Sequence, residues 1–185
     1  CALPIWAAGP AHVVVHDWGG PIGWALLERR PDLVAHFVAV NAPEGDAYRR
    51  EVTSSRKQLK ASWYTLLFQV PFIERWMAAN GALALVKALR GSSARGTFTD
   101  EDIELYVGPL RDPARLAAGL SYYRAAFKPF VEGLRSKDDA PRKPLTEVPV
   151  IVLWGERDEA VTVGVAERIV REVCPEAELR RLPEA

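Results

Sequence analysis

The feature that most constrains this fold is an apolar, β-branched run at residues 11–16 (AHVVVH), followed at once by an aspartate, a tryptophan and two glycines. Such a run predicts a buried strand, and the glycines predict a sharp turn after it. Residues 20–30 carry an apolar face at helical spacing and stop before Pro31, which predicts a helix. Residues 33–41 (LVAHFVAVN) predict a second buried strand. Strand, helix and strand in this order predict a βαβ unit with two parallel strands.

The middle of the chain follows a different pattern. From about residue 44 to residue 146, helical periodicity dominates, and turn or capping residues divide the stretch. The expected helical segments are 63–68, 72–80, 83–90, a capped start at residue 99, and 113–127. Residues 136–144 are polar, charged and punctuated by proline, which predicts a linker back to the strands. The chain therefore predicts a long helical insertion within a strand-containing core.

The strand pattern returns after the insertion. Residues 148–154 (VPVIVLW) predict a third apolar strand, which ends in residues 155–158 (GERD). Residues 163–173 then predict a helix, and residues 178–182 predict a short fourth strand. The fold class expected from these segments is α/β, with a mostly parallel sheet and flanking helices.

Composition narrows the class of partner. The 24 basic and 24 acidic residues cancel, so no net field would attract nucleic acid or an anionic membrane, and a small, neutral, largely apolar substrate fits this balance better. No apolar run reaches the roughly 18 to 20 residues needed to span a bilayer. Two cysteines without a C-x-x-C pair are compatible with a cytoplasmic protein. The sequence leaves the oligomeric state open.

Residues 16–20 (HDWGG) carry the chemistry. They lie between a predicted strand and a predicted helix, where a sharp turn would lift the central side chain clear of the sheet, the geometry of a nucleophile elbow. The central residue is Asp17, not a serine or cysteine. A carboxylate can attack an sp³ carbon and form an alkyl ester, which water must then hydrolyse. An aspartate nucleophile therefore favours this chemistry over acyl transfer.

The sequence resembles the epoxide hydrolase and haloalkane dehalogenase branch of the α/β-hydrolase fold. Residues 13–43 are similar to the elbow, helix and following strand of that family, and residues 148–158 to its strand bearing the catalytic acid. Within the insertion, residues 62–69 and 120–124 (LSYYR) resemble the helical cap of epoxide hydrolases. The resemblance implies a partial α/β-hydrolase core at residues 1–43 and 147–185, incomplete at both ends, with an inserted cap at 44–146.

The resemblance also implies roles for particular residues. Asp17 would be the nucleophile, and the backbone N–H of Trp18 would contribute to the oxyanion hole. Asp158 would orient a histidine base. Tyr64 and Tyr123 would donate hydrogen bonds from the cap to the epoxide oxygen, because an alkoxide leaving group needs an acid where a halide does not. The paired tyrosines therefore favour epoxides over alkyl halides, and no cofactor or metal is implied.

Several departures from the family pattern accompany these roles. Val15 stands two residues before Asp17, where the family normally has glycine, and is expected to crowd the elbow. None of the three histidines follows Asp158, whereas the family places its base after that acid. The strands that normally precede the elbow and the other oxyanion loop are also missing. The chain is therefore expected to be a fragment that forms the ester without turning over.

Each site residue also has a plainer interpretation. Asp17 could be a helix N-cap, and Asp158 a turn residue or an ion-pair partner of Arg157. Tyr64 and Tyr123 could be core residues of cap helices. The tyrosine assignment could also belong to the adjacent residue 122 instead of 123, and the side chain of residue 18 could serve packing alone.

Two further patterns do not support a metal or nucleotide site. His12 and His16 lie four residues apart in a predicted strand, about 13 Å from each other, too far to share one ion. Both are expected to be structural. Residues 91–96 (GSSARG) are glycine-containing but lack the lysine and hydroxyl pair of a phosphate loop, which favours a cap loop.

The resulting hypothesis is hydrolysis of an epoxide to a vicinal diol through an ester on Asp17. Two alternatives stay open. In the first, a haloalkane or haloacid dehalogenase uses the same aspartate to displace halide. In the second, the chain is a non-catalytic remnant or a ligand-binding protein that lacks the histidine base.

Overall fold

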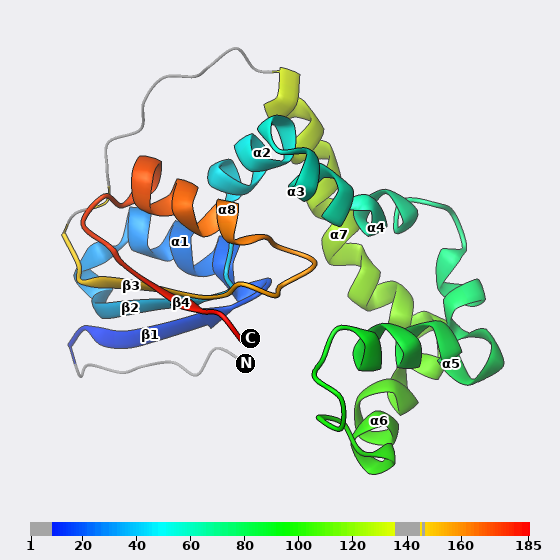
Figure 1. Ribbon diagram of the computed structural model, residues 1–185. Coiled ribbons are helices and arrows are strands. Elements are labelled where there is room, and N and C mark those ends of the chain that lie inside the picture. The colour runs from blue at the N-terminus through cyan, green and yellow to red at the C-terminus, as the bar shows by residue number, and fades with distance from the viewer. Residues whose placement is uncertain (1–8, 136–144, 146) are drawn as a thin grey trace. The chain divides into compact units, whose positions relative to one another are not determined.

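The computed structural model describes residues 9–135, 145 and 147–185, so the linker expected at 136–144 lies outside the described residues. The chain divides into two compact units (Figure 1). The first unit draws on Cys1–Ala61 and Lys137–Ala185, and the second is Ser62–Ser136.

A parallel four-stranded sheet forms the centre of the first unit. Its order follows the sequence: β1 (Ala11–His16), β2 (Val34–Val40), β3 (Val150–Gly155) and β4 (Glu178–Leu182). The register pairs His16 with Val40, and Val40 with Leu153. The carboxyl ends of the first three strands therefore reach the same edge of the sheet, where ligand sites of open α/β sheets lie. All four predicted strands and the parallel βαβ unit are confirmed.

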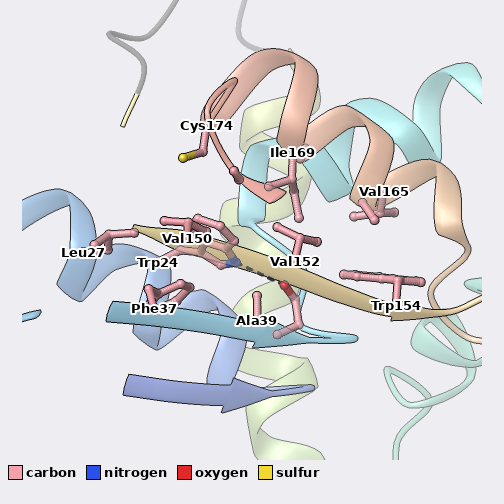
Figure 2. Close-up of a cluster of buried hydrophobic side chains, with 14 of the residues drawn as sticks. Trp24, Leu27, Phe37, Ala39, Val150, Val152, Trp154, Val165, Ile169 and Cys174 are labelled. Atoms are coloured by element: carbon pink, nitrogen blue, oxygen red, sulfur yellow. Dashed lines mark hydrogen bonds between the residues drawn. The ribbon is translucent and has the colours of Figure 1, made fainter. Parts of the chain in front are cut away.

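Helices cover one face of this sheet. Figure 1 shows α1 (Gly19–Arg29) and α8 (Val163–Arg168) on the same side, and α8 continues as a π-helical turn at Ile169–Val173. Between them and the strands lies the main core, in which Trp24, Phe37 and Ile169 are buried (Figure 2). Burial of each such side chain contributes roughly 1.5–3 kcal/mol. The indole Nε1 of Trp24 also donates to the carbonyl of Ala42 at 3.1 Å, which ties α1 to the end of β2.

Helices α2 (Gly45–Ser54) and α3 (Arg56–Ala61) pack with the first unit, although the sequence places residues 44–61 in the expected cap. Polar contacts as well as apolar packing hold these two helices against the first unit. Arg168 of α8 donates to Glu51 of α2 at 2.9 Å, with both side chains largely buried, and Gln58 of α3 bonds to the loop before α8. The structural boundary after Ala61 thus differs from the expected boundary at residue 44. The assignment of a cap stays a prediction.

The second unit is helical. It consists of α4 (Trp63–Leu67), α5 (Ile73–Gly91), α6 (Asp100–Val107), a 3-10 turn at Gly108–Arg111, and α7 (Pro113–Arg135). Left-handed φ angles at Asn80, Gly81 and Ala82 break α5 into two parts, as the sequence predicts with separate helices at 72–80 and 83–90. A capping box between Thr99 and Asp102 starts α6 at the predicted position. Helix α7 extends past the predicted end at 127.

Candidate active site

Asp17 lies in the turn between β1 and α1. Its backbone φ is +47°, a left-handed conformation that aspartate tolerates better than most side chains. The backbone N–H of Gly20 donates to the carbonyl of Asp17 at 2.8 Å and closes the turn. Trp18, and not Asp17, occupies the N-cap position of α1. The strand therefore ends in a tight turn with an exposed aspartate, and a simple capping role does not describe Asp17.

Two glycines of α1 allow this turn to pack closely. A Cβ at Gly20 would lie 2.7 Å from the carbonyl oxygen of Pro43, so the start of α1 approaches the chain after β2 as only glycine permits. A Cβ at Gly23 would lie 2.5 Å from Cγ1 of Val15. Val15, which stands where the family normally has glycine, therefore occupies space that Gly23 leaves open. The elbow forms with the valine in place.

The pKa of the Asp17 carboxyl lies above its usual value, chiefly because the surrounding chain removes water from it. The charge of His16 acts in the opposite direction and lowers this pKa, the charge of Asp158 raises it, and a hydrogen bond from the backbone N–H of Trp18 lowers it. The ionised carboxylate is thus less well hydrated than one in open water, which suits a nucleophile. It also lies close enough to Asp158 to sense its charge.

Three donors hold the carboxylate of Asp158, which follows β3. The backbone N–H groups of Ala160 and Val161 each donate to Oδ1 at 2.8 Å. The side-chain Nδ2 of Asn41 donates to Oδ2 at 2.6 Å. Because both carboxylate oxygens have fixed partners, the orientation of Asp158 is set before any base binds to it.

Asn41 is a candidate site residue that the sequence reasoning missed. It directly follows β2, has a left-handed φ of +39°, and accepts a hydrogen bond on Oδ1 from the backbone N–H of Gly155 at 3.0 Å. Its amide therefore links the ends of β2 and β3 and orients Asp158. An asparagine at the carboxyl end of a buried strand was the available signal, because such ends meet at the site edge of a parallel sheet.

Arg157, the residue before Asp158, pairs with a different carboxylate. Arg157 forms its ion pair with Glu184, so the plainer interpretation of Asp158 as the partner of Arg157 does not match the structure. A carboxylate with its lone pairs already directed can accept a further N–H donor at a defined angle. Chemically, this is suited to orienting an imidazole and stabilising its positive charge.

The two predicted cap tyrosines meet within the second unit. The rings of Tyr64 and Tyr123 lie 6.0 Å apart edge to face, and the ring of Phe68 contacts both, at 5.5 Å and 4.7 Å. Tyr123 is half-buried, whereas the adjacent Tyr122 is 60% exposed. Of the two neighbouring tyrosines, Tyr123 is therefore the one that pairs with Tyr64. Such edge-to-face pairs contribute about 0.5–1.5 kcal/mol beyond area burial.

An ion pair supports this aromatic cluster. Arg124, next to Tyr123 on α7, donates through Nε to the carbonyl of Phe68 at 3.1 Å and through Nη2 to Glu74 of α5 at 2.8 Å. The hydrogen bond from Arg124 holds the pKa of the Glu74 carboxyl below its usual value. The cluster is thus tied to the helices at both ends of the loop after α4.

One histidine of β1 pairs with the histidine of β2. His12 and His36 are register partners on adjacent strands, and their Nδ1 atoms lie 3.0 Å apart. Within the part of the chain that the structure describes, no three His, Cys, Asp or Glu side chains are arranged to hold a metal ion. Among the same residues, no helix is both long and apolar enough to cross a membrane.

The structure thus places the five predicted site residues in two groups. Asp17, Trp18 and Asp158 lie at the carboxyl ends of strands in the first unit, whereas Tyr64 and Tyr123 lie together in the second unit. Each group is internally ordered by contacts that the sequence did not reveal. Their functional roles stay predictions.

Comparison with known proteins gives a consistent match. Residues 8–185 match the family described as alpha/beta hydrolase fold. AB hydrolase superfamily protein YfhM of Bacillus subtilis is 31% identical over 176 residues, which cover 95% of this chain and 58% of that protein. Epoxide hydrolase 3 of Xenopus tropicalis is 30% identical over 179 residues, covering 89% of this chain and 46% of that protein.

A solved structure agrees with these relatives. The crystal structure of an epoxide hydrolase from Bacillus megaterium in complex with an inhibitor is 31% identical, with a TM-score of 0.74. The match covers 95% of this chain and 62% of that one. This chain therefore spans between 46% and 62% of the length of the three relatives.

Proposed function

This chain belongs to the α/β-hydrolase fold family, and from that premise we propose that the protein is an epoxide hydrolase that uses Asp17 as its nucleophile. The proposed substrate is a small, neutral, largely apolar epoxide, and the product is a vicinal diol. The observation that carries the proposal is an aspartate in the left-handed turn between β1 and α1, near a second, firmly held carboxylate, Asp158. Relatives named epoxide hydrolases support the substrate class.

The first step would open the epoxide ring. A carboxylate oxygen of Asp17 attacks one ring carbon, and the bond between that carbon and the epoxide oxygen breaks. The departing oxygen accepts hydrogen bonds from the phenols of Tyr64 and Tyr123 and takes a proton from one of them, and that phenolate regains a proton from water. The product is a hydroxyalkyl ester of Asp17. The edge-to-face packing of the two tyrosines supports a role as a pair.

The second step would release the diol. A base removes a proton from water, the resulting hydroxide attacks the ester carbonyl carbon, and the backbone N–H of Trp18 stabilises the oxyanion. Breakage of the acyl bond gives a carboxylic acid on Asp17 and an alkoxide, a proton passes from the acid to the alkoxide to give the Asp17 carboxylate and the diol, and the base releases its proton to water. Asp158 would orient the base, which in the family is a histidine after the acid. His12, His16 and His36 all precede Asp158, so this step is proposed for the whole protein.

A single-turnover experiment on the whole protein tests the proposal. The protein is mixed with styrene oxide, quenched at short times, digested, and analysed by mass spectrometry. We expect added mass on the peptide that contains Asp17, followed by its loss as phenylethanediol appears. Label at another residue, or diol without any label on Asp17, would contradict the proposed nucleophile.

Product assays on the same whole protein distinguish the proposed epoxide hydrolase from a dehalogenase and from a non-catalytic binding protein. A dehalogenase would release chloride from a chloroalkane and give no diol from styrene oxide. A non-catalytic binding protein would give neither product and no added mass on Asp17. The 185-residue polypeptide is a further test, because we expect it to form the ester at most once. Steady turnover by this polypeptide would contradict the need for a base after Asp158.

A further inference from the structure

A buried glutamine outside the proposed site holds the loop that carries the catalytic acid. Gln58 lies on α3 and is fully buried, with 0% of its surface exposed. Its Nε2 donates to the carbonyl of Ala160 at 2.9 Å. Its Oε1 accepts hydrogen bonds from the backbone N–H of Thr162 at 2.8 Å and from its hydroxyl at 2.9 Å. A buried amide with three such bonds is a directional constraint and not a packing residue alone.

One residue that Gln58 binds, Ala160, also holds Asp158, and the other, Thr162, follows the second loop residue that holds Asp158. Ala160 donates its backbone N–H to Oδ1 of Asp158 and accepts from Gln58 through its carbonyl. Val161 also donates to Oδ1 of Asp158, and its carbonyl accepts from the indole of Trp154 at 3.0 Å. The N–H groups of this short loop therefore bind the Asp158 carboxylate, and its carbonyl groups accept hydrogen bonds from the buried side chains of Gln58 and Trp154.

We propose that Gln58 is a positioning residue for Asp158, acting through the loop at residues 160–162. This inference rests on the proposed function, because it assigns Gln58 to the step that Asp158 serves. Loss of the amide would leave the carbonyl of Ala160 and the N–H of Thr162 without buried partners, so the loop would shift toward water. The two N–H groups on Asp158 would shift with it. Asn41 would then hold the carboxylate alone.

Gln58 lies close in sequence to the boundary between the two units. Helix α3 ends at Ala61, and the second compact unit begins at Ser62. Gln58 thus anchors the chain to the acid loop just before it leaves the first unit. The residue belongs to the segment that the sequence assigns to the cap, yet its side chain serves the core.

The catalytic test separates the two chemical steps. In Gln58→Leu of the whole protein, we expect ester formation on Asp17 to stay within about twofold, because no hydrogen bond joins Asp17 to this loop in the described part of the chain, and ester hydrolysis to slow about tenfold. The pH profile of hydrolysis should change while that of ester formation does not. Thr162→Val, which removes one of the three bonds, should slow hydrolysis by less.

Two controls exclude a general loss of stability. Val52→Ala removes buried apolar volume from α2, and Gln69→Leu removes a hydrogen bond from Nε2 to the carbonyl of Thr65 in the second unit. Neither should change the ratio of the two steps. An equal fall of both rates in Gln58→Leu, or unchanged hydrolysis in a folded variant, would overturn the positioning role.

Amide hydrogen exchange tests the inference without catalysis. We expect the N–H groups of Ala160 and Val161 to exchange about tenfold faster in Gln58→Leu and in the milder Gln58→Glu, with exchange in α1 unchanged. Unchanged exchange at these two amides would overturn the inference even if the ester forms. Absence of any ester on Asp17 in the unaltered protein would instead overturn the proposed function, and exchange would still decide whether Gln58 holds the loop.

Discussion

The two units hold their proposed functional groups by different physical means. In the first unit, backbone conformation and short, directional hydrogen bonds fix Asp17 and Asp158 at the ends of parallel strands, with Asn41 between them. In the second unit, ring packing on helices brings Tyr64 and Tyr123 together. A hydrogen bond fails when one partner is lost, whereas a ring contact survives removal of a hydroxyl. Replacing a hydrogen-bonding side chain by one of similar shape should therefore displace the proposed functional groups of the first unit. In the second unit, such a change should remove a hydroxyl and leave the rings in place.

The largest effect is expected for Asp17→Asn. The amide keeps the shape of the side chain but lacks the nucleophilic carboxylate, so ester formation should fall at least about 10⁴-fold. Single-turnover mass spectrometry with styrene oxide measures the loss. Asp32→Asn, which removes an exposed carboxylate paired with Arg30, is the control and should keep full activity. Labelling of the Asp17→Asn variant at the wild-type rate would exclude Asp17 as the nucleophile.

A double substitution tests the proposed role of Tyr64 and Tyr123 in the second unit. Replacing both Tyr64 and Tyr123 by phenylalanine keeps the rings and removes the proposed acids, so epoxide opening should slow about 10²- to 10⁴-fold. The edge-to-face contacts of the two rings should remain in the double variant. Tyr122→Phe on the same helix is the matched control and should be near neutral. Equal effects of the control and the double variant would remove the pair from the mechanism.

Asn41→Leu tests how much the amide of Asn41 contributes to holding Asp158 in the first unit. The leucine has similar volume but cannot donate to Asp158 or accept from Gly155. We expect ester hydrolysis to slow about 10- to 100-fold, because a hydrogen bond to a charged group contributes about 1.5–3 kcal/mol, while ester formation stays nearly unchanged. Quenched-flow measurement of both rates checks this. A larger loss in ester formation than in hydrolysis would contradict the assignment of Asn41 to Asp158.

The ionised carboxylate of Asp17 should also lower the free energy of unfolding at neutral pH. Its folded-state pKa is raised, so ionisation is less favourable in the folded than in the unfolded chain and weakens folding at neutral pH. Asp17→Asn should therefore raise the Tm at pH 7, and this gain should fade below the usual aspartate pKa, where both states are protonated. Asparagine tolerates the same left-handed φ, so the backbone does not confound the comparison. A gain that persists at low pH would point to another cause.

The smallest effect is expected at the ion pair in the second unit. Glu74→Gln keeps the shape of the partner of Arg124 but removes its charge. Because the folded-state pKa of Glu74 is lowered, its contribution to stability is present above the usual glutamate pKa and disappears as the pH falls through the lowered value. Epoxide opening should change less than about fivefold, since a partly exposed ion pair contributes little. Scanning calorimetry at pH 7 and at low pH should show a small Tm difference only at pH 7.

Much of the fold followed from local patterns. The run before Asp17, the glycines after it and the alternation of strands and helices predict β1, α1 and β2 to within a residue or two, because these elements depend on neighbouring residues. The boundary of the helical insertion did not follow in the same way. Helix α3 buries the polar Gln58 while its Leu59 is 59% exposed, and apolar periodicity does not predict such a contact.

Local sequence patterns predicted the four strands, the helices that follow β1 and β3, the helices of the second unit, the aspartate at the elbow and the acidic residue after β3, but they did not predict α2 and α3 as separate helices. Tertiary structure alone decided how Asp158 is held. Asn41 is 117 residues from Asp158, and Gln58 is 104 residues from Thr162. Whether such distant polar groups meet depends on the order of the strands and on which helix covers which edge, which local periodicity does not encode. Hydrogen bonds are directional over about 3 Å, so only the assembled core could select these partners.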